Sequence, residues 1–531
     1  MIRASFVLAL SLLASSVQAQ TRVPAGANLQ AALDAALPGD ILELDAGATF
    51  TGNYTLPVKN GTAPVTVRTR GLTLPNARID PAANLATLRT PNSTPALRTV
   101  GNTAHWRFDG IRFAAGASQS DIVALGDTVT ADAAQLPRDL VFDRSIFQAD
   151  TSAKNGLSLN SAETTIRRSR FTGVKLAGIE SHAIICTNGP GPFTIEDNYI
   201  EAGSIGVMFG GAKPAVPNLV PSDILFEYNT VTRPLAMRGQ TGWGIKNIFE
   251  LKNARNVVVR GNVFEHNWPD AQAGWTITIT VRANSTTAPW TTIQHVLFEH
   301  NIVRHASAGF NILGLDNQVP SPGAPVYPST PMDDVIIRNN LVYDIDRWVW
   351  TGPRPENVGN GVFMQVDGAP RNLHVEQNTG MANGNILNLL GPPIPGFVFR
   401  RNIVQKVRSI NPATGSLVDS YGVNGNGVGE GNPAVSTYLP HVAGFPDAVF
   451  TGNVLAGATA SQYTLVPGNV FPPVTGLMAD FVDPASGNYR LVPTSSLRAL
   501  PTGMAGADQD TIEQALVRPA LRPVTNVRMV P

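Results

Sequence analysis

Two basic residues in consecutive strand-like segments are the side chains of this chain best suited to chemistry. Lys252 ends one segment, Arg282 ends the next, and Glu250 lies two residues before Lys252. A lysine or arginine can act as a base when a neighbouring cation and desolvation lower its pKa, and a cation can also hold a carboxylate. β-Elimination on a uronate needs a neutralised carboxylate, a base for the C5 proton and an acid for the leaving glycosidic oxygen. We therefore predict that Lys252, Arg282 and Glu250 form a catalytic group.

The segments that hold these residues belong to a series with one shared pattern. They cover 156–161, 184–189, 206–211, 249–254, 279–284, 312–317 and 363–368. Because alternate side chains of a strand point to opposite faces, each segment has an inward and an outward set. The alignment takes as inward Leu159, Thr187, Phe209, Leu251, Val281, Leu315 and Val366. If the strands stack about 4.8 Å apart, the outward positions form one exposed strip.

The outward strip predicts a substrate groove, walled by inserts at 265–275, 284–292 and 316–332. With two tryptophans on or near these inserts, the predicted substrate-binding residues are Asn160, Asn188, Asp316, Asp367, Gln365, Trp275 and Trp290. Asp316 and Asp367 take equivalent positions in this alignment, and a pair of carboxylates would also suit glycoside hydrolysis. His182, His266, His300 and His305 show no metal-ligand spacing, so the sequence predicts no metal site.

A second recurring phrase shows which elements position these residues. It alternates apolar and polar residues, as a half-buried strand does, and ends in Asn. The asparagine shared by these phrases is Asn198, Asn229, Asn262, Asn301, Asn340, Asn378, Asn402 and Asn453. Upstream, Ser145 and Ser169 take the same place. Successive gaps range from 24 to 51 residues, which indicates a coil of fixed minimum length that carries insertions. We predict a right-handed parallel β-helix over about residues 40–500, with the asparagines stacked as a ladder at turns where Asn adopts a left-handed backbone.

These patterns resemble the pectate-lyase-like superfamily. Residues 23–50 resemble its start, with a capping helix at 28–36 before the first strand, and residues 481–493 resemble its last coil. Around Lys252 and Arg282 the chain is similar to the alginate-lyase and chondroitinase-B group of polysaccharide lyases. That resemblance implies that Lys252 is the base and Arg282 the acid. The group's calcium-binding glutamates correspond to Asn247 and Ile245, so Ca²⁺ is possible but its ligands are not matched.

Composition and termini complete the sequence-based predictions. Residues 1–19 have the basic start, short apolar core and small-residue cleavage site of a signal peptide, so we expect a secreted or periplasmic protein. We assign 20–505 to the β-helix domain and 506–531 to a C-terminal tail. The zero net charge argues against nucleic acid as a partner. No other long apolar run is present. We expect a monomer that binds a polysaccharide, as a lyase, as a hydrolase using Asp316 and Asp367, or as a non-catalytic carbohydrate-binding solenoid.

Overall fold

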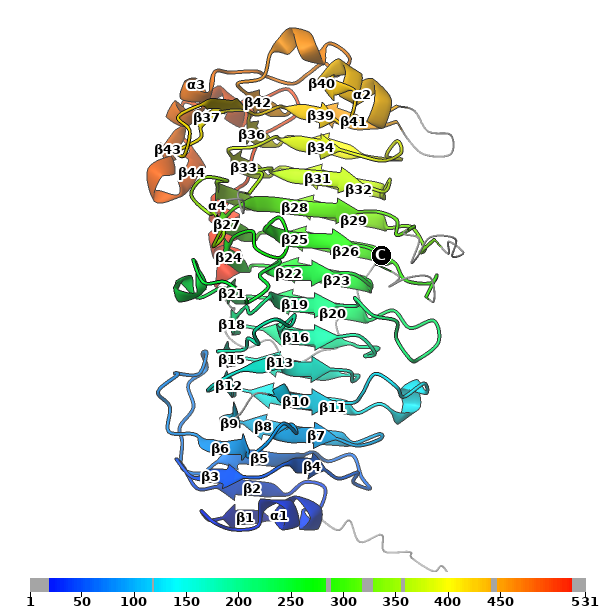
Figure 1. The fold of residues 1–531 in the computed structure, drawn as a ribbon, viewed down its shortest axis with the longest axis vertical. Coiled ribbons are helices and arrows are strands. Elements are labelled where there is room, and N and C mark those ends of the chain that lie inside the picture. The colour runs from blue at the N-terminus through cyan, green and yellow to red at the C-terminus, as the bar shows by residue number, and fades with distance from the viewer. Residues whose placement is uncertain are drawn as a thin grey trace, which may run out of the picture.

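Three long β-sheets make up the body of the molecule (Figure 1). The computed structural model describes residues 19–116, 119–282, 288–317, 328–354, 359–440 and 447–517. The predicted signal peptide at 1–19 and the end of the predicted tail therefore lie almost wholly outside the described residues. Among the described residues, no helix is long and apolar enough to cross a membrane.

Sheet A has fourteen strands, all paired in parallel. In stacking order they are β1 (Gln20–Val23), β2 (Ile41–Leu44), β5 (Val65–Thr69), β8 (Ala104–Asp109), β11 (Arg138–Asp143), β14 (Thr164–Arg167), β17 (Phe193–Glu196), β20 (Ser222–Glu227), β23 (Ala254–Arg260), β26 (Ile293–Glu299), β29 (Asp333–Arg338), β32 (Arg371–Glu376), β35 (Val398–Arg400) and β41 (Val449–Thr451).

Sheet B has thirteen strands, again parallel. They are β3 (Thr49–Thr51), β6 (Ala86–Thr90), β9 (Ile111–Ala115), β12 (Ile146–Ala149), β15 (Arg170–Thr172), β18 (Tyr199–Glu201), β21 (Thr230–Thr232), β24 (Val263–Asn267), β27 (Ile302–Ala306), β30 (Leu341–Ile345), β33 (Thr379–Ala382), β36 (Ile403–Gln405) and β42 (Val454–Ala456).

Sheet C, also of thirteen strands, is parallel apart from its last pair. Its strands are β4 (Tyr54–Leu56), β7 (Leu97–Thr99), β10 (Gln119–Leu125), β13 (Ala153–Leu159), β16 (His182–Cys186), β19 (Ile205–Phe209), β22 (Phe249–Leu251), β25 (Trp275–Thr280), β28 (Ala308–Leu313), β31 (Met364–Asp367), β34 (Leu387–Leu389), β39 (Val423–Gly425) and β40 (Gly429–Glu430).

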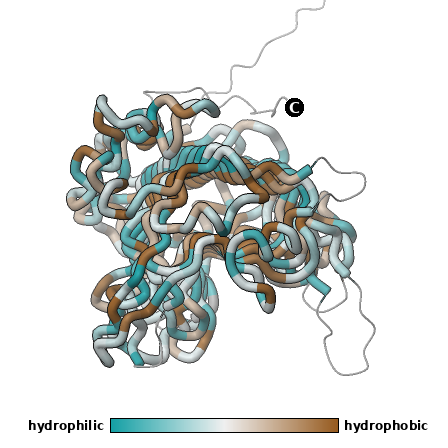
Figure 2. The backbone as a smooth tube through the Cα atoms, turned by 90° about the horizontal axis from the view of Figure 1, so that it is seen from above, coloured by the Kyte–Doolittle hydropathy of each residue, from teal (hydrophilic) through white to brown (hydrophobic). Residues whose placement is uncertain are grey.

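Each coil passes through the sheets in the order C, A, B, as β22, β23 and β24 do before β25, β26 and β27. The right-handed parallel β-helix predicted from the repeats is confirmed. Seen along the stack, successive coils lie behind one another, and the long connections project from the corners (Figure 2). The A-to-B corner is short in every coil except the one between β5 and β6, where residues 70–85 intervene, so most inserts fall at the C-to-A and B-to-C corners, on both sides of sheet C.

The core consists of the alternate apolar residues of these strands. In β5 the order is buried, half-buried, buried, half-buried, buried for Val-Thr-Val-Arg-Thr. Equivalent residues of neighbouring coils stack on each other, as the ring centroids of Phe147 and Phe171 do at 4.3 Å and those of Phe108 and Phe142 at 5.1 Å. Stacking of like side chains in a parallel sheet fills the interior at the spacing that the strands impose.

The asparagine ladder occupies the A-to-B corner, as predicted. The side-chain oxygen of Asn301 accepts from the backbone N–H and the Nδ2 of Asn262, at 2.9 and 3.0 Å, and Asn301 donates in the same way to Asn340. Ser145 and Ser169 continue the ladder, because the Ser145 N–H donates to Ser169 Oγ at 3.0 Å. The rungs are fully buried, so each amide satisfies backbone groups that water cannot reach.

The left-handed residue at this corner is not the asparagine, which corrects the sequence-based expectation. It is the residue directly before the ladder position, with φ between 48° and 70° in coil after coil: Arg144, Arg168, Asp197, Tyr228, Gly261, His300, Asn339, Gln377, Arg401 and Gly452. One left-handed residue turns the chain, and this leaves the asparagine amide free to hydrogen-bond along the stack.

Both ends of the stack carry additional structure. At the N-terminal end α1 (Leu29–Ala35) covers the core with Leu29 and Leu33, and Asn28 caps it by accepting from the Ala31 N–H at 3.1 Å. The predicted capping helix is thus present, although β1 precedes it. Near the other end lie α2 (Asn432–Tyr438), the hairpin β37 (Arg408–Ile410) and β38 (Leu417–Asp419), and α3 (Val474–Ala479).

The last coil differs from the sequence-based expectation. Sheets A and B end at Thr451 and Ala456. The segment expected as the final coil, 481–493, instead contains an antiparallel hairpin of β43 (Phe481–Asp483) and β44 (Asn488–Leu491). This hairpin and α4 (Gln509–Leu516) pack on the outer side of sheet B, where Tyr489, Leu491 and Ile512 join Leu341 and Ile403 in a second apolar cluster. The repeating pattern stops because these residues cover the stack from outside.

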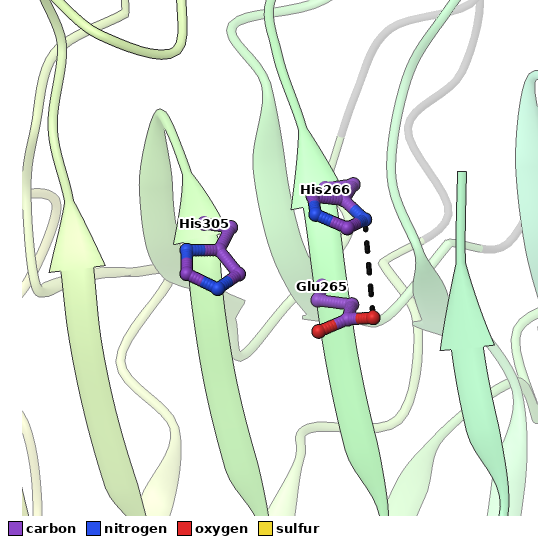
Figure 3. A group of neighbouring side chains, drawn as sticks. All are labelled: Glu265, His266 and His305. Carbon is purple, nitrogen blue, oxygen red and sulfur yellow. Dashed lines mark ion pairs between the residues drawn. The ribbon is translucent and has the colours of Figure 1, made fainter. Parts of the chain in front are cut away.

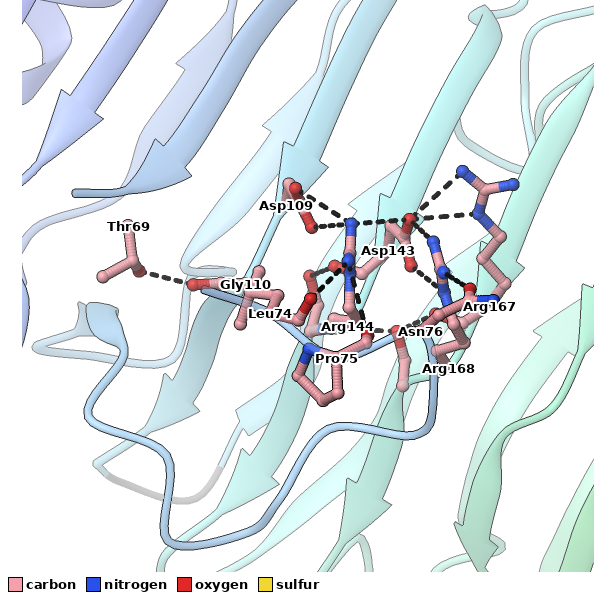
Figure 4. A network of polar contacts seen from close by, with 12 residues as sticks. Thr69, Leu74, Pro75, Asn76, Asp109, Gly110, Asp143, Arg144, Arg167 and Arg168 are labelled. Atoms are coloured by element: carbon pink, nitrogen blue, oxygen red, sulfur yellow. Dashed lines mark hydrogen bonds and ion pairs between the residues drawn. The ribbon is translucent and has the colours of Figure 1, made fainter. Parts of the chain in front are cut away.

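A further covering segment, residues 72–84, crosses the outside of the A-to-B corner near the N-terminal end (Figure 4). Arg168 lies at its centre: it donates to Asp143 Oδ1 at 2.7 Å and to Asn76. The Ile79 N–H donates to the carbonyl of Arg168 at 2.8 Å, and Arg78 donates to Asp197 Oδ1 at 2.8 Å. The segment is therefore fixed to several coils by charge-assisted hydrogen bonds.

Candidate functional site

The outer face of sheet C carries a row of polar side chains. Glu250 pairs with Thr278, Thr278 with Asn311, and Asn311 with Gln365 in the registers of β22, β25, β28 and β31. The inward neighbours Leu251, Ile279, Ile312 and Val366 are fully buried core residues. Gln365 Nε2 donates to Asn311 Oδ1 at 3.2 Å. Connections leave sheet C on both sides of this row, and parts of the predicted groove walls, residues 284–287 and 318–327, lie outside the described residues.

Lys252 and Arg282 lie together at one edge of this face. The Arg282 N–H donates to the Lys252 carbonyl at 3.0 Å, which makes the two residues neighbours on consecutive coils. Lys252 Nζ lies 3.1 Å from Glu250 Oε2, and Arg282 Nη1 lies 3.5 Å from Asp316 Oδ1. The side chains of Lys252 and Arg282 are 19% and 33% exposed, whereas Glu250 is completely buried. The structure therefore brings Lys252, Arg282, Glu250 and Asp316 together.

The sequence-based register of sheet C is wrong in part. It aligned Val281 and Leu315 with Leu251, whereas Ile279 and Ile312 take those places. Asp367 accordingly pairs with Leu313, and Asp316 lies three residues further along its coil. Asp367 accepts from the Gly368 N–H at 2.6 Å. The equivalence of Asp316 and Asp367 that suggested a pair of hydrolytic carboxylates is not present in the structure.

The predicted register is also displaced by one residue at strand β16. Cys186, not Thr187, is the inward residue, since it pairs with Phe209 in the core. Burial raises the pKa of the Cys186 thiol to about 12, so this thiol remains protonated at neutral pH.

Asn160 and Asn188 are buried at the C-to-A corner. The Asn160 side-chain oxygen accepts from the backbone N–H groups of Thr187 and Asn188, at 3.1 and 2.9 Å. Asn188 Nδ2 donates to the carbonyls of Asp127 and Thr130 at 3.1 and 2.9 Å. Both side-chain amides thus bind the backbone of the C-to-A connections. Asn160 and Asn188, which the sequence predicts as substrate-binding residues, therefore have a structural role.

The two predicted tryptophans lie in different settings. Trp275, 6% exposed, packs with Ala308 and Val362 in a small cluster at the start of its strand. Trp290 is half-buried in the C-to-A insert, and its Nε1 donates to the carbonyl of Leu219 at 3.2 Å. Trp290 therefore joins two neighbouring inserts on one wall of the predicted groove.

Sequence reasoning missed a second polar group on the same face. His182, almost completely buried, contacts Asn155 Oδ1 through Nδ1 at 2.9 Å and Glu180 Oε1 through Nε2 at 3.0 Å. Lys246 Nζ also donates to Glu180. The hydrogen bond from His182, together with Lys246, lowers the pKa of Glu180 to about 2 despite partial burial. The missed signal was the outward position at the start of β13 and β16, where Asn155 and His182 pair in register.

This second group continues into the first. Asn247, next to Lys246, donates through Nδ2 to Glu250 and, at 3.0 Å, to Gln272 Oε1. A chain of polar contacts thus extends from His182 to Lys252 across three coils of sheet C.

The residues at the positions of the calcium ligands do not fit Ca²⁺. Ile245 is buried against Met237 and Trp268 and offers no oxygen. Asn247 Oδ1 has no hydrogen-bond partner among the described residues, but its Nδ2 faces Glu250. The ammonium of Lys252 already lies on the second carboxylate oxygen of Glu250. Ca²⁺ takes six to eight oxygen ligands, and this set falls far short.

No protein-family model matches the sequence, and no curated protein matches it. Solved structures do resemble it. The PL6 family alginate lyase AlyGC is 14% identical with a TM-score of 0.47, and the match covers 95% of this chain and 60% of that one. A mannuronic-acid-specific family 6 lyase from human gut microbiota is 11% identical with a TM-score of 0.44, covering 94% and 98% of the two chains.

A GH87 α-1,3-glucanase from Streptomyces thermodiastaticus matches at 12% identity and a TM-score of 0.42, covering 83% of this chain and 66% of that one. All three solved structures have TM-scores below 0.5. At such low identity they carry no information about the reaction.

Proposed function

We propose that the protein is a polysaccharide lyase that cleaves a uronate-containing glycan by β-elimination. The observation that supports this is the placement of Lys252 and Arg282 on consecutive coils, joined by a backbone hydrogen bond of 3.0 Å and both partly exposed on the outer face of sheet C. The uronate carboxylate requires a cation and the C5 proton requires a base, and a neighbouring arginine and lysine can supply one each.

In the proposed reaction Lys252 is the base and Arg282 the acid. The Lys252 amine takes the C5 proton, the electron pair forms the C4–C5 double bond, and the C4–O bond breaks. Arg282 donates the proton that the leaving glycosidic oxygen takes up, and its guanidinium would also hold the carboxylate. Glu250 Oε2 lies 3.1 Å from Nζ and so fixes its position. The protein cations take the place of a metal ion.

The rest of this face of sheet C would bind the rest of the glycan. Asn311 and Gln365 present amide groups on successive coils, whereas the hydroxyl of Thr278 beside them is buried. Sugar hydroxyls need donors and acceptors of this kind. A chain lying along the stack would meet one such group per coil, about every 4.8 Å.

The experiment is a degradation assay with matched variants. Alginate, pectate, chondroitin and ulvan are each incubated with the protein, and the ultraviolet absorbance of the unsaturated product is followed. We expect product with at least one substrate, and a fall of at least about 100-fold in kcat/KM for Lys252→Ala and Arg282→Ala, the lower range for general acid–base catalysis. Lys59→Ala, which removes a lysine near the N-terminal end, is the control.

Three outcomes would contradict the proposal. New reducing ends without the chromophore would indicate hydrolysis instead of elimination. Binding without cleavage would indicate a carbohydrate-binding solenoid. Full activity in both variants, with melting temperatures like that of the parent, would remove Lys252 and Arg282 from the reaction.

A further inference from the structure

Two histidines stack on neighbouring strands of sheet B (Figure 3). His266 lies on β24 and His305 on β27; their ring centroids are 5.4 Å apart and their planes are nearly parallel, at 14°. Glu265 precedes His266, and its Oε1 lies 3.9 Å from His266 Nδ1. One potential ligand atom from each of the three residues lies within 4.8 Å of the other two.

The hydrogen bonds around these residues leave the remaining ligand atoms free. His305 Nδ1 lies 2.7 Å from Asp344 Oδ2, and His266 Nδ1 lies 2.9 Å from Thr232 Oγ1. Arg304 holds the other oxygen of Glu265, with Nε to Oε2 at 2.8 Å. Among the described residues none hydrogen-bonds the Nε2 of either histidine. A carboxylate on Nδ1 fixes the tautomer whose Nε2 can bind a metal.

The cluster is covered but reachable. The ring of Trp350 lies 5.6 Å from that of His266 and 5.5 Å from that of His305, and its Nε1 donates to Asp344 Oδ2 at 3.0 Å. The side chains of Glu265, His266 and His305 are 14%, 20% and 31% exposed. An ion can therefore reach the three side chains. Trp350 contacts His305 and Asp344 and keeps this pair in place.

We propose that Glu265, His266 and His305 bind one divalent transition-metal ion of the zinc type. Two imidazoles and one carboxylate, with a fourth position open, form a common ligand set for such ions. Metal–ligand bonds of about 2.0–2.2 Å place tetrahedral ligands roughly 3.4 Å apart, so the three side chains need to move by about 1 Å. The bound ion links β24 to β27 and thereby stabilises two consecutive coils. Asp344 is a positioning residue for His305.

Sequence reasoning missed this site because the ligands come from different coils. His266 and His305 are 39 residues apart, one full coil, and only the stacking brings them together. Motif spacings for metal sites reflect ligands within a helix or a short loop. The proposal is independent of the proposed lyase activity, because its test measures metal binding alone.

The experiment titrates metal-free full-length protein with Zn²⁺ by calorimetry and with Co²⁺ by visible absorption. We expect one ion per chain, a d–d spectrum typical of mixed nitrogen and oxygen ligands, and a higher melting temperature with Zn²⁺. His266→Ala and His305→Ala should each weaken binding at least about tenfold. Asp344→Asn should weaken it about 10- to 100-fold while keeping the Co²⁺ spectrum.

His295→Ala is the matched control, because His295 also contacts a carboxylate, Asp334, at 2.8 Å but has no second imidazole beside it among the described residues. Binding in this variant should equal that of the parent. Equal binding in the parent, His266→Ala and His305→Ala, with each variant folded by circular dichroism, would overturn the proposal. So would failure of the parent to bind either metal at micromolar concentration.

Discussion

Glu250 is the residue on which the proposed site depends most directly. It is completely buried on the outer side of sheet C, and it contacts Lys252 and Asn247. A buried carboxylate without a cation is costly, so the two residues stabilise each other as well as setting the position of Nζ. Lys252 was identified from the sequence as an outward cation, but the burial of its partner was not, because the covering side chains come from the neighbouring B-to-C connections.

Lys252→Met should therefore destabilise the protein, by about 1–3 kcal/mol, since Glu250 is left buried without its cation. The double variant Glu250→Gln/Lys252→Met should recover part of this loss, because no charge remains. Urea unfolding of the four proteins of this cycle measures the coupling between the two residues. If Lys252→Met is as stable as the parent, the Glu250–Lys252 pair does not contribute to the free energy of unfolding.

The contacts of Glu180 predict a dependence of stability on pH. Its pKa in the folded protein is about 2, lowered chiefly by the hydrogen bond with His182, and it is near 4.5 when unfolded. A lowered pKa gives stability that is present above the unfolded value and is lost as the pH falls towards the folded value. Parent and Glu180→Gln should thus differ most in melting temperature at neutral pH and converge between about pH 4.5 and pH 2. A difference that grows on acidification would contradict this origin.

At the scale of the strand and the corner, the sequence predicts the A-to-B side well and sheet C poorly. The ladder could be located because every coil that carries it repeats the same short corner, and hydrogen bonds from Asn262 to Asn301 and from Asn301 to Asn340 confirm it. In sheet C the strands enter and leave through inserts of variable length. Apolar residues two positions apart, such as Ile279 and Val281, then fit the inward position equally well. The pattern alone therefore does not determine the register of neighbouring strands in sheet C.

Asn301→Ala tests the ladder. It removes an acceptor for two donors of Asn262 and a donor to the Val259 carbonyl, all buried. We expect a loss of about 2–4 kcal/mol, since each unsatisfied buried group costs about 1–3 kcal/mol. Asn301→Ser should cost less, because Ser169 shows that a hydroxyl can accept from the preceding coil at this corner. Calorimetry of the three proteins provides the comparison, and an equal loss in both variants would argue against the ladder as the cause.

At the scale of the whole molecule, additional segments cover the first coil and the outside of the A-to-B corner of the stack. Helix α1 covers the first coil, residues 72–84 cross the A-to-B corner near the N-terminal end, and the C-terminal segment runs back along the same corner. The Gly506 N–H donates to the Arg401 carbonyl at 2.7 Å, that of Ala507 to Thr379 Oγ1 at 2.9 Å and that of Asp508 to Asn339 Oδ1 at 2.6 Å. These contacts occur in reverse coil order, so one short segment joins several coils.

Removal of this segment should destabilise the C-terminal half of the stack while leaving the proposed site in place. A chain truncated before Gly506 loses the three hydrogen bonds and the burial of Ile512, whose side chain is completely covered against the outer face of sheet B. Loss of a buried isoleucine alone costs about 2–5 kcal/mol, so the melting temperature should fall by several degrees. Binding of a hydrophobic dye should rise because Leu341 and Ile403 become exposed. A second truncation, after Val517, separates the contribution of residues 506–517 from that of the residues beyond. If both truncated chains melt at the temperature of the parent, residues 506–517 do not stabilise the stack. If only the chain truncated before Gly506 melts at a lower temperature, the contacts of residues 506–517, including those with Arg401, Thr379 and Asn339, account for the loss.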